Sequence, residues 1–145
     1  MIYYVREGNT VYAYYGNLDG DITNNQYASK YWYNDLLRYF LKHTPEISCE
    51  DIGEVILSVI SECTESGMKF YGEARCHPDD NFSRTLGYHI AGHRLLDKYL
   101  TIQTRIAKEL LKISKSYYKL GKIVKADKRK GVNVYRRKTK RVTGT

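Results

Sequence analysis

The segment from Tyr71 to Arg94 concentrates the residue types that build metal and proton-transfer sites. Its 24 residues include one cysteine, three histidines and two adjacent aspartates: Cys76, His77, Asp79, Asp80, His89 and His93. His89 and His93 are four residues apart, so a helix would place them on one face, a spacing that many zinc sites use. Adjacent carboxylates can also bind Mg²⁺. Zinc binding, magnesium binding and proton transfer are therefore the chemistries to consider first.

The strand that should carry Cys76 argues against a metal site. Apolar and polar residues alternate over 68–76, so Cys76 belongs to the inward face and His77 to the outward face. Zinc needs ligands that converge, and these two side chains would diverge. No other residue type supplies an oriented base for a cysteine nucleophile, and no second acidic cluster supports a magnesium nuclease. We therefore expect no catalytic residues, no metal and no cofactor.

A strand-to-helix corner explains more of the segment. Gly72 permits a close backbone approach, and Pro78 ends the strand. Asp79, Asp80 and Ser83 supply side-chain acceptors for the start of a helix, and we expect Asp80 to act as its cap.

Length and composition indicate a soluble globular protein. A chain of 145 residues can bury its own core without disulfides. The three cysteines are widely spaced and form no CxxC pair, which is typical of a reducing compartment. The start has no basic segment followed by an apolar run, and no later run is long enough to span a membrane. We expect a cytoplasmic protein with no membrane partner.

Periodicity predicts an α+β fold with a small, mainly antiparallel three-stranded sheet. Alternation predicts a hairpin over 2–15, and the third strand covers 68–76. Thr23 and Gln26 predict a capping box for a helix from about 24 to 42. Ser48 and Gly67 bound a second helix. Apolar positions recur at helical spacing within it: Ile52, Val55, Ile56, Val59, Ile60 and Cys63.

One long basic helix follows, from about 84 to 122. Residues 1–122 should form a single domain, and residues 123–145 a basic C-terminal arm. Spacings of 3 and 4 predict an unbroken seam through Leu96, Tyr99, Gln103, Ile106, Leu110, Ile113, Tyr117 and Leu120. This seam would pack within the chain or against a second copy in a homodimer.

The basic residues are unevenly distributed. Residues 1–93 carry a net charge of −6, and residues 94–145 a net charge of +14. Seven cations of the long helix form a stripe about 36 Å long, roughly 160° from the seam. Together with the arm they are the predicted nucleic-acid-binding residues: Lys98, Arg105, Lys108, Lys112, Lys115, Lys119, Lys122, Lys128, Arg129, Lys130, Arg136, Arg137, Lys138, Lys140 and Arg141.

Part of the corner segment resembles a motif of small phage and prophage proteins of Gram-positive bacteria. The matching residues are Gly72, Ala74, Cys76, Pro78, Asp80, Phe82, Gly87, Ile90, Ala91 and Arg94, within 23 of the 145 residues. The resemblance implies a phage accessory protein in the cytoplasm of a bacterial host cell, without an assigned activity. Because such loci also encode inhibitors of host CRISPR nucleases, it makes an anti-CRISPR protein a candidate.

The charge distribution favours a non-enzymatic protein that binds nucleic acid, DNA or RNA, or a nucleoprotein complex. An alternative is an inhibitor of a host defence nuclease such as an RNA-guided Cas effector. In that case the acidic residues of the second helix would meet a basic channel while the basic helix holds the guide RNA: Glu50, Asp51, Glu54, Glu62 and Glu65. A metal-dependent enzyme is the third hypothesis.

Overall fold

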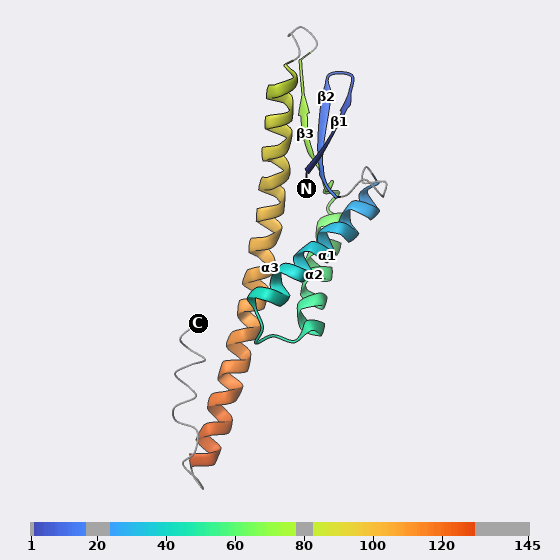
Figure 1. Ribbon diagram of the computed structural model, residues 1–145. Helices are drawn as coiled ribbons and strands as arrows, with labels where there is room; N and C mark the ends of the chain where they lie inside the picture. Colours follow the sequence, from blue (N-terminus) through green and yellow to red (C-terminus); the bar gives the residue numbers. More distant parts are fainter. Residues whose placement is uncertain (1, 17–23, 78–82, 130–145) are drawn as a thin grey trace. The chain divides into compact units, whose positions relative to one another are not determined.

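The computed structural model describes residues 2–16, 24–77 and 83–129, and it has an α+β fold (Figure 1). The elements follow in the order β1 (Ile2–Glu7), β2 (Thr10–Tyr15), α1 (Asn25–His43), α2 (Cys49–Glu65), β3 (Gly72–Arg75) and α3 (Arg84–Arg129). The chain divides into two compact units, which we call unit 1 (Met1–Ile106) and unit 2 (Ala107–Thr145). The predicted fold class is confirmed.

The hairpin forms where alternation predicts it. β1 and β2 are antiparallel and in register from Ile2 opposite Tyr15 to Glu7 opposite Thr10. The two-residue connection needs a positive φ, which Gly8 supplies at 59°. β2 then pairs with β3, so the sheet has the order β1-β2-β3.

The third strand is shorter than predicted, but its alternation is confirmed. Phe70, Gly72 and Ala74 are buried, and Tyr71 and Glu73 lie on the other face. Gly72 is packed against the backbone of α3, where a Cβ would overlap the carbonyl of Ala91 and the amide of Leu95. A glycine at this position therefore lets α3 lie directly on β3, as Figure 1 shows for the first part of that helix.

The first two helices begin and end at capping residues. Asn24 caps α1, because its side chain accepts hydrogen bonds from the amides of Gln26 and Tyr27. The predicted cap at Thr23 is wrong by one residue. For α2 both predictions are confirmed, since Ser48 accepts from the Asp51 amide at 3.2 Å and Gly67 follows the helix with a φ of 86°.

The core of unit 1 lies between the sheet, α1, α2 and the first part of α3. Trp32 of α1 is at its centre, fully buried, with its ring edge-on to the rings of Tyr15, Phe70 and Tyr99. Buried aliphatic side chains surround this aromatic cluster: Val11, Leu36, Ile52, Ile56, Leu95 and Ile106. Tyr99 also donates a hydrogen bond to the Asp35 carboxylate, which ties α3 to α1.

The predicted seam of α3 is wrong in its register. Only Ile106 and Leu110 of its eight members are buried, whereas Leu96, Tyr117 and Leu120 are exposed. Between residues 85 and 120 of α3, the buried residues are Ala91, Leu95, Ile102, Ile106 and Leu110. An α-helix has 3.6 residues per turn rather than the 3.5 of a heptad, so a heptad frame drifts around the helix surface. The homodimer through the seam stays a prediction.

Helix α3 continues to Arg129, beyond the predicted end near residue 122. The remaining part of the predicted arm, 130–145, lies outside the described residues. Among the described helices, none combines the length and the apolar character that crossing a bilayer requires.

Candidate nucleic-acid interface

The division of charge follows the division into units. Residues 107–145 contain 14 Lys and Arg and two Asp and Glu, a net charge of +12, and residues 1–106 have a net charge of −4. Unit 2 is thus the polycationic part of the molecule, and unit 1 contains the first two cations of the predicted stripe, Lys98 and Arg105.

Lys98 is a structural residue of unit 1. Its ammonium donates hydrogen bonds to the carbonyls of Tyr71, at 2.7 Å, and Lys69, at 3.0 Å, in the segment that leads into β3. The ammonium also lies 5.5 Å from the centre of the Tyr71 ring. Burial lowers the pKa of Lys98, and the charge of Glu73 partly offsets that effect. A half-buried ammonium with these partners stabilises β3 on α3 and is poorly placed to contact a phosphate.

Arg105 also has an internal partner. Its guanidinium forms an ion pair with the Glu62 carboxylate of α2 and lies 3.9 Å from the Cys63 sulfur. This partner comes from another helix rather than from α3 itself. Both side chains are about half exposed, so the pair contributes little to stability.

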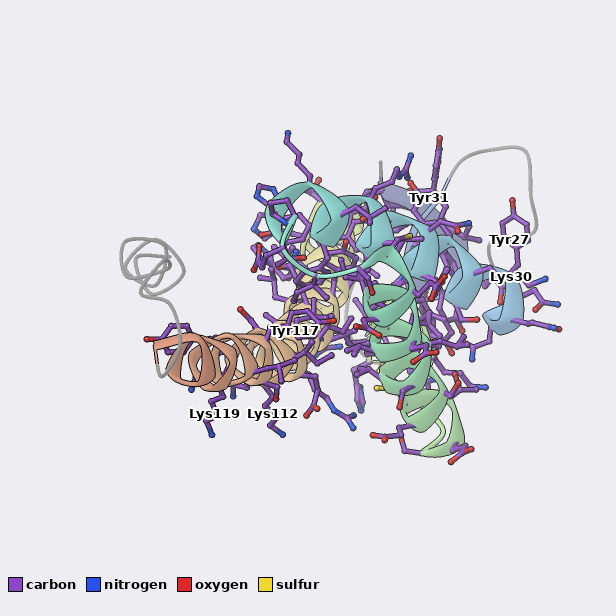
Figure 2. All side chains as sticks on the ribbon, turned by 90° about the horizontal axis from the view of Figure 1, so that it is seen from below. Tyr27, Lys30, Tyr31, Lys112, Tyr117 and Lys119 are labelled. Carbon is purple, nitrogen blue, oxygen red and sulfur yellow. The ribbon has the colours of Figure 1, made fainter. Side chains whose placement is uncertain are left out.

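Four lysines of unit 2 lie together on one side of α3. Lys108, Lys112, Lys115 and Lys119 are all exposed. Their spacing of 4, 3 and 4 residues confines them to an arc of about 60° and a length of about 16 Å on α3. Figure 2 shows Lys112 and Lys119 projecting from the same side of the helix, with Tyr117 on another side. We call these four residues the lysine face.

One acid, Glu109, lies within the span of the lysine face, residues 108–119. Glu109 pairs with Lys112 at 3.1 Å, and their side chains are 45% and 73% exposed. Such an exposed pair is screened by water and is easily exchanged for another anion. Its i, i+3 spacing made Glu109 recognisable in the sequence, whereas nothing local indicates Glu62 as the partner of Arg105.

The other predicted binding residues belong to the end of α3 and to the predicted arm. Lys122, Lys128 and Arg129 lie on the last turns of α3, where the backbone alone is described. The cations of the arm fall outside the described residues: Lys130, Arg136, Arg137, Lys138, Lys140 and Arg141.

The cysteine and histidine segment runs from β3, which ends at Arg75, to α3, which begins at Arg84, and residues 78–82 of the predicted corner lie outside the described residues. Cys76 donates its amide hydrogen to Asn9 at 2.8 Å, beside the hairpin turn. The Nε2 atoms of His89 and His93 are 3.1 Å apart, so one ring donates to the other. The described residues contain no group of three or more metal-ligating side chains of these types. Asp79 and Asp80 lie outside them.

The start of α3 is capped by Ser83. Its side-chain oxygen accepts a hydrogen bond from the Leu86 amide at 3.3 Å, and its carbonyl accepts one from Gly87 at 2.9 Å. The cap is therefore Ser83, three residues after the predicted Asp80.

Comparison of the chain with protein-family models, curated proteins and solved structures finds no match. The resemblance to phage and prophage proteins stays a prediction.

Proposed function

We propose that this protein binds nucleic acid, DNA or RNA, through phosphate contacts of the lysine face. The observation that carries the proposal is the geometry of unit 2. Lys108, Lys112, Lys115 and Lys119 are exposed on one side of a helix, and Glu109 is the one acid between residues 108 and 119.

Helical geometry makes this face suitable for a polyanion. Four ammonium groups held on one backbone meet successive phosphates with less ordering cost than four groups on a flexible segment. Phosphate contacts release counterions, which gives affinity without dependence on base sequence. The net charge of +12 in unit 2 would also attract a nucleic acid over distance and raise the association rate.

The alternative is that the lysine face is only a solvated surface without a ligand. Reversing the charge of two of its lysines distinguishes this alternative from phosphate binding. Lys108 and Lys115 are the best targets because both are exposed and neither forms an ion pair with another described residue. Arg105 and Lys112 are less suitable, since reversing either one would also break an ion pair. We expect the double change to Glu to weaken binding of duplex DNA, single strands and structured RNA by at least tenfold.

The matched control reverses Lys42 and Lys69, two exposed lysines of unit 1, with the same change in net charge. Circular dichroism checks the fold of both variants, and fluorescence anisotropy measures binding. The proposal requires that the control bind within about twofold of the parent. Equal weakening by both variants would mean that net charge alone governs binding, and unchanged binding by the Lys108 and Lys115 variant would refute the proposal.

A further inference from the structure

A hollow on the outer side of α1 has the chemistry of a binding site in unit 1. It has a volume of about 610 Å³ and is lined by two tyrosines, two cations, an amide and one apolar residue: Tyr27, Lys30, Tyr31, Asn34, Leu37 and Arg38. Figure 2 shows Tyr27, Lys30 and Tyr31 projecting outward from the helix. We call this set the α1 groove.

None of these residues belongs to the buried side of α1. Ala28, Trp32, Leu36 and Phe40 form the buried side of α1 at the usual helical spacing. The groove residues occupy the other side, and Tyr27 is 38% exposed. Tyr31, one turn further along the helix, is half-buried, so both tyrosines keep part of their ring surface available to a ligand.

The charge of α1 selects an anionic ligand. Lys30 lies between the two tyrosines along the helix, and Arg38 lies about 10 Å beyond Tyr31. Arg38 also has a loose exposed pair with Asp35, at 3.6 Å. Helix α2 has the opposite character, with five acids and no Lys or Arg between Cys49 and Glu65. The cations of the groove thus lie on a basic helix in a unit whose net charge is −4.

We propose that the α1 groove binds single-stranded nucleic acid. Bases would stack on the rings of Tyr27 and Tyr31. Lys30 would contact the phosphate between the two stacked bases, and Arg38 a phosphate beyond Tyr31. Aromatic rings combined with cations are the common means of binding single strands, because every base has a stacking face and every nucleotide a phosphate. A duplex keeps its base faces inside the stack, so this site should discriminate against it. The inference goes beyond the lysine face, because it concerns unit 1 and assigns a ligand class of its own.

The test compares ring removal with ring retention in the full chain. The double change Tyr27→Ala and Tyr31→Ala should weaken binding of single-stranded DNA and RNA oligonucleotides by about tenfold or more, the typical loss when stacking contacts are removed. Binding of duplex DNA should stay within twofold. The double change to Phe keeps both rings and should keep single-strand binding.

Two more variants test whether the effect is specific to the groove. Tyr39→Ala removes an exposed tyrosine of the same helix that is outside the groove, and it should bind single strands like the parent. Lys30→Glu tests the groove without altering a ring, because Lys30 is exposed, and it should weaken single-strand binding several-fold.

The outcomes distinguish this inference from the proposed function. If the alanine and Lys30 variants bind single strands as tightly as the parent while the lysine-face variant fails, the groove inference is wrong and the proposed function stands. If the lysine-face variant binds normally and the groove variants lose only single strands, the reverse holds. Loss of a nuclease-resistant protein partner by the groove variants, with single-strand binding unchanged, would also overturn the inference.

Discussion

Lys98 and Lys115 look alike in the sequence, and the structure predicts opposite consequences when each is changed to methionine. Methionine keeps an unbranched side chain and removes the ammonium. At position 98 the change removes two hydrogen bonds and leaves the carbonyls of Lys69 and Tyr71 without this donor. Because the Lys98 ammonium is half-buried, we assign each bond the ordinary net contribution of about 0.5–1.5 kcal/mol, so the loss of both should cost about 1–3 kcal/mol.

The assay is urea unfolding combined with a salt series of nucleic-acid binding. For Lys98→Met the urea midpoint should fall by roughly 0.5–1.5 M, given a typical slope of about 2 kcal/mol per M. Its salt dependence of binding should match that of the parent. Lys115→Met should leave the midpoint unchanged and reduce the slope of log K against log salt by about 0.9 on duplex DNA. A stable Lys98→Met variant with a reduced salt slope would refute the structural role of Lys98.

Three further predictions concern unit 1. Burial and the hydrogen bond to Asp35 raise the pKa of Tyr99, so the folded state favours the neutral phenol and its contribution is complete below pH 10. The free energy of unfolding should therefore fall as pH rises above 10. Urea unfolding at pH 8, 10 and 11 should show a smaller fall for Tyr99→Phe than for the parent. An equally steep fall in both proteins would contradict the assignment of this pH dependence to Tyr99. Gly72→Ala should cost about 3 kcal/mol or more by thermal unfolding, because its Cβ would overlap the backbone of α3; a change below 1 kcal/mol would show that β3 and α3 are not in contact there. Ser83→Ala should cost about 1 kcal/mol as a lost N-cap, with nucleic-acid binding unchanged; the idea fails if calorimetry shows no loss.

Local sequence signals predicted the elements of unit 1 because each signal acts within a few residues. Alternation predicted the hairpin, and Ser48 with Gly67 predicted the bounds of α2. Thr23 and Asn24 are both good caps, so local chemistry could not decide between them. The same ambiguity applied to Asp80 and Ser83.

The register of α3 and the roles of its cations depend on tertiary contacts. Leu95 and Leu96 are equally apolar, and the sheet decides which one is buried. Lys98 and Arg105 share the heptad spacing of Lys112 and Lys119, but carbonyls before β3 and a carboxylate on α2 engage the first two. The sequence predicts the lysine face as part of a longer stripe. It does not show where the face begins, because that depends on the tertiary contacts of Lys98 and Arg105.

The most direct test of the lysine face as a phosphate-binding surface is the number of counterions released on binding. We would measure log K against log salt on duplex DNA for the parent and for a variant with Lys108, Lys112, Lys115 and Lys119 all changed to Gln, which keeps the helix and removes the four charges. Each lost phosphate contact lowers the slope by about 0.9, so four lost contacts should lower it by about 3–4. A folded variant whose slope equals that of the parent would show that these lysines do not contact the phosphates.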